Sequence, residues 1–255
     1  MISIKTPEEI KILRDGGKIL ASILLKVADK AKLGVTTFEL DEYAEFLIKE
    51  AGGGPAFKNY KTGDDKYPFP SALCVSINDE VVHGIPAQDR ILKEGDIISL
   101  DLGLKWRGLY TDAAITVGVG KISADAEKLL NVTKSALEKG IKVIKEKSAI
   151  GDIGFAVQSY VEASGFNVVK KLVGHGVGYV VHEEPEIPNF GKKRSGEILK
   201  EGMILAIEPM VCFGSADVVL DKNGWTWKTK DGFLAAHFEH TIAVTKKGCE
   251  ILTKL

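Results

Sequence analysis

The sequence predicts an α/β fold of the α+β type, in which helices and antiparallel strands come from two similar halves. Three observations support this prediction. Two capped amphipathic segments open the chain, an apolar hairpin pattern follows at residues 91–117, and the same order of patterns returns after residue 120. We therefore expect a single domain over residues 1–255, with an internal duplication whose halves are roughly 1–120 and 121–255.

Two helix starts are clear in the first half. Thr6 and Glu9 stand three residues apart and predict a capping box, and Thr36 and Glu39 repeat that pattern. Each pair is followed by apolar residues at helical spacing. The Gly-, Lys- and Pro-rich stretch 55–70 is expected to be an exposed loop.

The same elements return in the second half of the chain. Its sequence predicts two helices and then a strand, which are expected over residues 124–147, 152–164 and 168–173.

The segment 91–117 predicts a β-hairpin, because two β-branched-rich runs flank a short turn. With Leu104 paired with Leu109, Asp101 falls directly opposite Asp112. Two opposed carboxylates about 5 Å apart repel by on the order of 3 kcal/mol at an effective dielectric of about 20. A shared proton or a bound cation would neutralise them. A pairing shifted by one residue would instead point the two aspartates to opposite faces of the sheet.

The internal repeat is carried by three matched segments. The matched pairs are 91–95 with 198–202, 81–83 with 180–182, and 112–117 with 239–244. Short matches are weak evidence alone, but here each half contributes one histidine and two carboxylates at corresponding places. The corresponding residues are His83 and His182, Asp101 and Glu208, and Asp112 and Glu239. His175 breaks the symmetry, because Ser76 takes its place in the first half.

Two halves packed as a pseudo-twofold pair would bring Asp101, Asp112, Glu208 and Glu239 together with His175. Four carboxylates in one pocket cannot all ionise without cations. An oxygen-rich set with one imidazole suits a pair of divalent ions such as Mn, Fe(II) or Co. Two such ions about 3.5–4 Å apart lower the pKa of a water between them, for attack on a carbonyl or phosphoryl group.

Seven separated segments stand in the order and spacing of the type I methionine aminopeptidases, and this resemblance covers nearly the whole chain. They are Val82-His83-Gly84-Ile85-Pro86, Leu100-Asp101-Leu102-Gly103, Thr111-Asp112, Gly174-His175-Gly176-Val177-Gly178, His182-Glu183-Glu184-Pro185, Ile207-Glu208-Pro209-Met210 and Phe238-Glu239-His240-Thr241. The resemblance implies the pita-bread fold, a curved antiparallel sheet backed by helices, with a two-metal site between two α-α-β-hairpin halves. It also implies removal of an amino-terminal methionine from nascent proteins and peptides, by metal-activated water, when a small residue follows.

The resemblance also implies a role for each matching metal ligand. Asp101 would chelate one ion, while Asp112 and Glu239 would bridge both. His175 and Glu208 would complete the other ion.

Three residues would act on the substrate. His182 would contact the scissile peptide and its developing oxyanion, and His83 would lie near the substrate amine. Glu208 would take a proton from the attacking water and pass it to the leaving amine.

The side-chain pocket for methionine is expected at or near Tyr67, Phe69, Cys74, Val181 and Trp225. The sequence departs from the family pattern at this pocket. Residues 66–70 differ from the usual Gly-Tyr-x-Gly segment, and Ala206 stands where a threonine is common.

Composition excludes several classes of partner. With 34 basic and 35 acidic side chains, the net charge is -1, which gives no electrostatic case for nucleic acid or an anionic membrane. Acidic residues stand where a signal peptide needs an apolar core, and no apolar run approaches the roughly 18 residues of a membrane span. Three cysteines without a C-x-x-C motif argue against a disulfide framework. We expect a cytoplasmic monomer with two divalent ions (Co, Mn, Fe(II) or Zn), acting on nascent polypeptide N-termini near the ribosome.

Two alternative functions are left open. The first is an Xaa-Pro aminopeptidase or dipeptidase of the same fold, although such relatives usually carry a large additional amino-terminal domain. The second is a non-catalytic peptide-binding relative, although such proteins tend to lose ligands and none is lost here. His237 and His240 are interpreted as structural residues, His240 because it should face away from its neighbour Glu239 on a strand.

Overall fold

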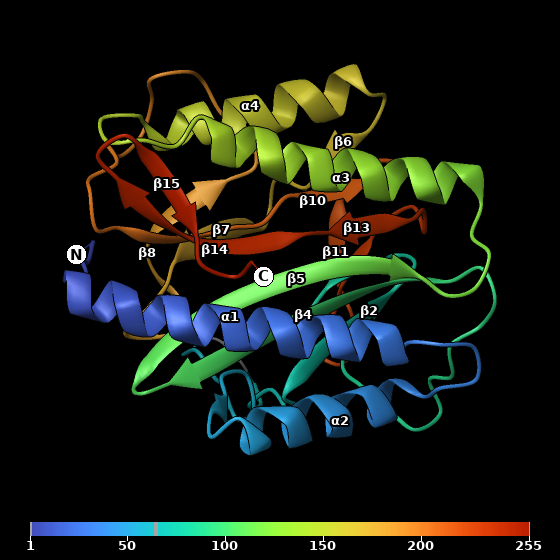
Figure 1. Ribbon diagram of the computed structural model, residues 1–255. Helices are drawn as coiled ribbons and strands as arrows, with labels where there is room; N and C mark the ends of the chain where they lie inside the picture. Colours follow the sequence, from blue (N-terminus) through green and yellow to red (C-terminus); the bar gives the residue numbers. More distant parts are fainter. Residues whose placement is uncertain (1, 64–65, 255) are drawn as a thin grey trace.

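The computed structural model describes residues 2–63 and 66–254 of the chain. A curved antiparallel sheet runs through the molecule. The helices are α1 (Pro7–Lys30), α2 (Thr37–Glu50), α3 (Ala124–Lys142) and α4 (Ile150–Ala163). Figure 1 shows α1 and α2 together on one side of the centre of the sheet and α3 and α4 on the other. No described helix is long and apolar enough to cross a membrane.

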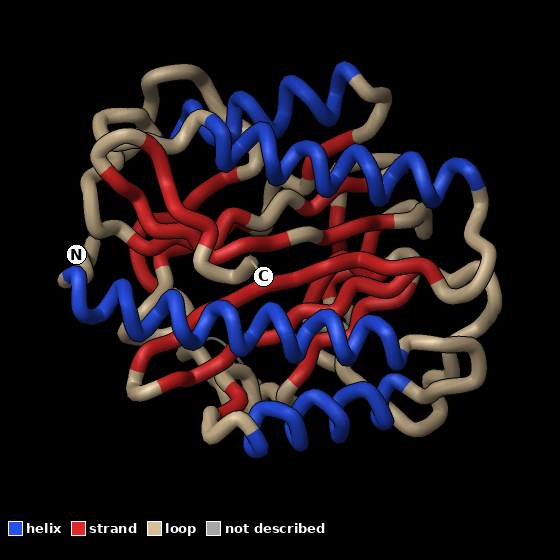
Figure 2. The backbone as a smooth tube through the Cα atoms, viewed as in Figure 1, coloured by secondary structure: helices blue, strands red, loops and turns tan. Residues whose placement is uncertain are grey.

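The large sheet has nine strands, all joined in antiparallel pairs. Its main path, in spatial order, is β1 (Gly54–Pro55), β4 (Ile97–Trp106), β5 (Leu109–Gly118), β14 (Glu239–Thr245), β9 (Ile204–Ile207), β7 (Val173–Gly176) and β8 (Glu183–Pro188). β2 (Leu73–Ile77) also pairs with β4, and β15 (Gly248–Ile251) with β14. The two halves of the chain therefore meet where β5 lies against β14, at the centre of Figure 2.

Two small sheets complete the fold. One contains β13 (Ala235–His237), β10 (Met210–Cys212) and β6 (Asn167–Val168), and the other contains β11 (Val218–Leu220), β12 (Trp227–Thr229) and β3 (Glu80–Val82). Because β12 pairs with β3, the second of these sheets joins the long connection after β10 to the first half of the chain.

Local signals placed the helix starts correctly. Both expected capping boxes are present, with the Thr6 and Thr36 hydroxyls accepting from the backbone N–H groups of Glu9 and Glu39. α3 is shorter than the expected 124–147, because the chain turns after Lys142 to pair with a later segment of the same half, where the Lys147 N–H donates to the carbonyl of Leu199 at 2.9 Å.

Two loop and strand boundaries differ from the prediction. The expected strand 168–173 is two short strands, β6 and β7, which pair with different sheets on either side of Lys170 and Lys171. The stretch 55–70 is not wholly exposed, since Phe57 and Phe69 are both buried. Its first residue pairs with β4, so this stretch folds back over the sheet.

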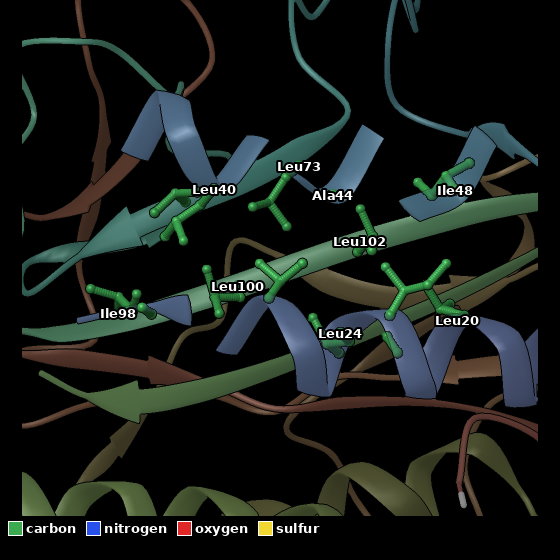
Figure 3. Packing of buried hydrophobic residues seen from close by; sticks show 14 of the residues in the cluster. Leu20, Leu24, Leu40, Ala44, Ile48, Leu73, Ile98, Leu100 and Leu102 are labelled. Atoms are coloured by element: carbon green, nitrogen blue, oxygen red, sulfur yellow. The ribbon is translucent and has the colours of Figure 1, made fainter. Parts of the chain in front are cut away.

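Alternating residues of β4 separate the core from the site. Leu100 and Leu102 are fully buried and face α1 and α2, where they pack with Leu20, Leu24 and Leu40 in the cluster shown in Figure 3. Because side chains on a strand alternate between its two faces, the residues between these leucines point away from the helices. Those residues include Asp101, which therefore faces the opposite side of the sheet.

The hairpin register differs by two residues from the one expected. The observed pairs are Trp106 with Leu109, Asp101 with Ala114, and Gly103 with Asp112. A two-residue turn with positive φ at Arg107 (48°) and Gly108 (89°) sets this register, as in turns whose twist matches that of the strands. The expected direct pairing of the two aspartates is wrong. They stay on one face as diagonal neighbours, because a shift of two residues preserves the side.

Candidate metal centre

A cavity of about 450 Å³ opens on the sheet face that lies away from the α1–α2 core. Its lining combines acidic, imidazole and apolar side chains from both halves of the chain. All the expected metal ligands line it, namely Asp101, Asp112, His175, Glu208 and Glu239, together with His83 and His182. The structure thus brings these seven residues, spread over more than 150 positions of sequence, to one place.

The four carboxylates are buried close together. Asp101 and Asp112 hydrogen-bond to each other through their side chains. Burial raises the pKa of Asp112 to about 7. Burial, followed by the negative charge of Asp112, raises the pKa values of Asp101, Glu208 and Glu239 well above their ordinary values. The cluster therefore needs protons or cations to be stable in the folded chain.

This donor set fits a divalent cation. Ligand atoms of Asp112, His175 and Glu239 all lie within 4.8 Å of one another. One carboxylate oxygen each of Asp101, Asp112 and Glu239 is buried without a hydrogen-bond partner in the described chain. Unpaired buried oxygens are costly unless something else satisfies them. A hard cation that prefers oxygen ligands, with one imidazole, would do so.

His175 is held in the form that binds metals. Its Nδ1 lies 2.9 Å from the carbonyl of Gly176, which leaves Nε2 directed toward Glu208, 3.5 Å from Oε1. Burial lowers the pKa of His175 to about 4, so the ring is neutral at pH 7. A Cβ at Gly174 would lie 2.5 Å from the carbonyl oxygen of Ala206. This glycine therefore permits the close approach of β7 to β9 that places the ring.

Thr241 holds the Asp112 backbone through two hydrogen bonds, an arrangement called here a threonine clamp. The N–H of Asp112 donates to Thr241 Oγ1 at 2.9 Å, and the Thr241 hydroxyl donates to the carbonyl of Asp112 at 2.7 Å. Both residues are buried. The clamp thus joins β5 to β14 beside the site, where the backbone pairing of these strands has ended.

His182 and His83 also line the cavity. The rings of His182 and His175 are 4.4 Å apart in an edge-to-face arrangement. Nδ1 of His182 lies 2.5 Å from the Tyr60 hydroxyl, and His182 remains exposed to solvent. His83 has a φ of 58°, and its ring lies 6.3 Å from that of Trp225.

Three of the five residues expected at the apolar wall line the cavity. Phe69, Cys74 and Trp225 line the cavity, and Val181 packs with them in a buried cluster. Tyr67 does not line it: its side chain is 59% exposed, and only its carbonyl takes part, by accepting from Trp225 Nε1 at 3.1 Å.

Two aromatic residues of the wall were missed by the sequence analysis. Phe57 and Tyr60 both line the cavity, although their segment was expected to be exposed. Two aromatic side chains three residues apart in a polar loop were the available signal. His237, interpreted as structural from the sequence, is only 1% exposed, and its Nε2 lies 3.4 Å from Glu208 Oε2. His240, interpreted as structural, contacts Thr253 at 3.0 Å and does not line the cavity.

Comparison with known proteins agrees with this geometry. Residues 11–246 match the model of metallopeptidase family M24. A methionine aminopeptidase of Bacillus subtilis (strain 168) is 47% identical over 255 residues, which cover 100% of both chains. A crystal structure of methionine aminopeptidase from Thermotoga maritima aligns with a TM-score of 0.96 and 45% identity, again over 100% of each chain.

A more distant neighbour shares the fold alone. The Xaa-Pro dipeptidase from Bacillus anthracis aligns with a TM-score of 0.78 at 23% identity, and this chain covers 62% of it. The full-length similarity to methionine aminopeptidases is much higher, and the expected pita-bread fold is confirmed. The chain uses divalent metal, as the family and the carboxylate cluster indicate. It therefore belongs to metallopeptidase family M24, and within that family to the methionine aminopeptidases.

Proposed function

We propose that this enzyme hydrolyses the first peptide bond of chains that begin with methionine, most efficiently when a small residue follows. The observation that supports this most directly is the continuity of the cavity, in which buried carboxylates and imidazoles adjoin an apolar wall. A volume of about 450 Å³ suits one apolar side chain and the adjoining peptide bond. Phe69, Cys74 and Trp225 offer the apolar contact for an unbranched side chain such as that of methionine.

The proposed cofactor is a pair of divalent ions, drawn from Co, Mn, Fe(II) and Zn. Asp101 would hold one ion, His175 and Glu208 the other, and Asp112 and Glu239 would serve both. Such ions polarise a carbonyl and lower the pKa of bound water, so that a nucleophile forms at neutral pH.

The chain's own side chains would handle protons and the substrate. Glu208 is proposed to accept a proton and return it to the leaving amine, because its carboxylate borders both His175 and the open cavity. His182 would donate to the carbonyl oxygen of the scissile bond, and Tyr60 would orient its ring through Nδ1. His83 would lie beside the substrate amine.

The proposed substrates are the amino termini of nascent chains near the ribosome, met in the cytoplasm by a monomeric enzyme. A net charge of -1 supports a protein that does not bind nucleic acid directly.

A peptide assay tests the function and the metal together. Metal-free protein is supplied with Mn, Fe(II), Co or Zn, and methionine release from Met-Ala-Ser is measured beside an Xaa-Pro peptide. We expect cleavage of Met-Ala-Ser only. Cleavage of the Xaa-Pro peptide alone would favour the proline-specific alternative, and cleavage of neither with any metal would favour a peptide-binding role.

Two substitutions test the metal ligands in the same assay. Asp112→Ala and Glu239→Ala are expected to abolish turnover while circular dichroism shows an unchanged fold, because each removes a ligand shared by both ions. Near-normal rates in either variant would contradict the two-metal assignment.

A further inference from the structure

The backbone hydrogen bonds reveal how the two halves correspond. In the first half, the Gly95 N–H donates to the carbonyl of Val119, and in the second half the Gly202 N–H donates to the carbonyl of Val244. Both distances are 3.0 Å. Glu239 pairs across the centre of the sheet with Ala114, its own counterpart under this correspondence. A residue of β5 thus corresponds to the residue 125 positions later, rather than 127 as the sequence match suggested.

This correspondence pairs Asp112 with His237, and not with Glu239 as expected. A second threonine clamp supports it. The N–H of His237 donates to Thr116 Oγ1 at 2.9 Å, and the Thr116 hydroxyl donates to the carbonyl of His237 at 2.7 Å. Thr241 makes the same two contacts with Asp112. The same pair of hydrogen bonds to a threonine hydroxyl therefore positions the backbones of Asp112 and His237 beside the site.

The side chains of the two corresponding residues also have corresponding neighbours. Asp112 hydrogen-bonds to Asp101, which corresponds to Glu208. His237 lies against Glu208, with Nε2 3.4 Å from Oε2. The ring is 1% exposed, and neither of its nitrogens has a hydrogen-bond partner in the described chain. A buried imidazole without a partner is costly, so its direction toward one carboxylate needs an explanation.

We propose that His237 is a positioning residue, whose neutral ring donates from Nε2 to Oε2 of Glu208 and so directs the other oxygen, Oε1, toward the metal position beside His175. This inference rests on the proposed role of Glu208. Donors of this kind orient metal-ligating carboxylates and support metal affinity. A direct ligand role is less favoured, because all five expected ligands line the cavity and His237 is not among the described residues that line it.

Two variants of His237 separate a donor from a packing residue. His237→Gln keeps an N–H donor in the pocket, whereas His237→Leu keeps bulk but removes the donor. His240→Gln is the matched control, because His240 is a partly buried histidine of the neighbouring strand β14 whose ring bonds to Thr253 and not to a carboxylate of the cluster. Thr116→Val provides a further variant, which keeps the imidazole side chain but removes the clamp that positions its backbone.

Manganese binding to each metal-free protein is measured by calorimetry, beside kcat and KM for Met-Ala-Ser at saturating manganese. We expect His237→Leu to lose about 10-fold or more in manganese affinity and to lower kcat with KM nearly unchanged. In His237→Gln, manganese affinity and kcat should both stay within about threefold of the parent values. Thr116→Val should weaken manganese binding, as His237→Leu does.

Three results would overturn the proposal. The first is a manganese affinity in His237→Leu equal to that of the parent protein. The second is an equal loss of manganese affinity in His237→Gln and His237→Leu. The third is the loss of one bound manganese ion in both variants, which would make His237 a ligand. If His237→Leu does not fold, parental affinity in Thr116→Val decides against the proposal. If the parent protein fails to cleave Met-Ala-Ser, the proposed function fails, but the calorimetric comparison still tests His237.

Discussion

At the scale of single residues, the site depends on burying groups that would be charged in water. Asp101, Glu208 and Glu239 are held where burial and mutual repulsion oppose ionisation. The surrounding histidines are shifted in the opposite direction, and burial lowers the pKa of His175 to about 4 and of His237 to about 3. Neutral imidazoles beside crowded carboxylates can bind a cation without first losing a proton.

Tyr60 offers a test at this scale. Tyr60→Phe removes the hydroxyl that contacts His182 Nδ1, so the imidazole loses its orienting partner. A lost hydrogen bond of this kind is worth about 1–1.5 kcal/mol, and we expect kcat/KM for Met-Ala-Ser to fall by about 10-fold with manganese affinity unchanged. Tyr67→Phe serves as the control, because that side chain is exposed and outside the cavity. Equal rates in Tyr60→Phe and Tyr67→Phe would show that the contact does not matter.

At the scale of elements, the central strands β5 and β14 are joined by side chains as well as by backbone pairs. Only Glu239 and His240 of β14 pair directly with β5, and threonine hydroxyls continue the connection on both sides. The hydroxyls satisfy backbone groups that a sheet would otherwise pair. The positions of Asp112 and His237 thus depend on two buried threonines.

Thr241→Val is the corresponding test. It preserves shape but leaves the N–H and carbonyl of Asp112 without partners, at a cost of about 1–3 kcal/mol in unfolding free energy. Urea denaturation of the metal-free protein measures this cost. Thr241→Ser keeps the hydroxyl and is expected to retain most of the stability. A Thr241→Val protein as stable as Thr241→Ser would refute the importance of the clamp.

The elements also show what sequence can predict. Capping boxes at Thr6 and Thr36 involve neighbours three residues apart, so local spacing identified both helix starts. The hairpin register depended on positive φ at Arg107, which its residue type does not signal. Phe57 and Tyr60 reach the cavity through a loop that folds back over the sheet.

The proposed metal ligands were predicted from motif resemblance and charge, and the structure brings them together in one cavity. His237 was interpreted only as a structural residue, because its place beside Glu208 follows from a cross-strand register at the end of a long connection. That register is a tertiary property, and the sequence match placed it two residues away.

At the scale of the whole molecule, the two halves share one cavity, so the state of the site affects global stability. Asp112 stabilises the metal-free fold only while protonated, and its contribution is lost as pH rises toward its raised pKa of about 7. His175 has the opposite effect on stability, because its pKa is lowered in the folded chain. Its contribution to the free energy of unfolding is lost as pH falls below the ordinary histidine pKa of 6.5. Above pH 6.5, only the loss of stability caused by ionisation of the carboxyl groups continues.

The metal-free protein is therefore expected to lose stability as pH rises from about 6.5 to about 8, by up to about 1.4 kcal/mol per pH unit for each carboxyl still protonated in the fold. Saturating manganese should raise the denaturation midpoint and flatten this slope, because cations then replace the protons. Urea unfolding at several pH values, with and without manganese, measures both effects. A flat profile in the metal-free protein would contradict the crowding of charge.

The pairing of Ala114 with Glu239 limits how alike the two halves can become. Both residues are buried, and directly paired strand residues have Cα atoms about 4.5–5.5 Å apart. Perfect twofold symmetry would demand either two glutamates at this point or two alanines. The first would add a fifth acid to a cluster that already holds four, and the second would delete Glu239, which is proposed to serve both ions. A metal centre on this axis must therefore be asymmetric. Catalysis requires the small methyl group of Ala114 in one half as much as the carboxylate of Glu239 in the other.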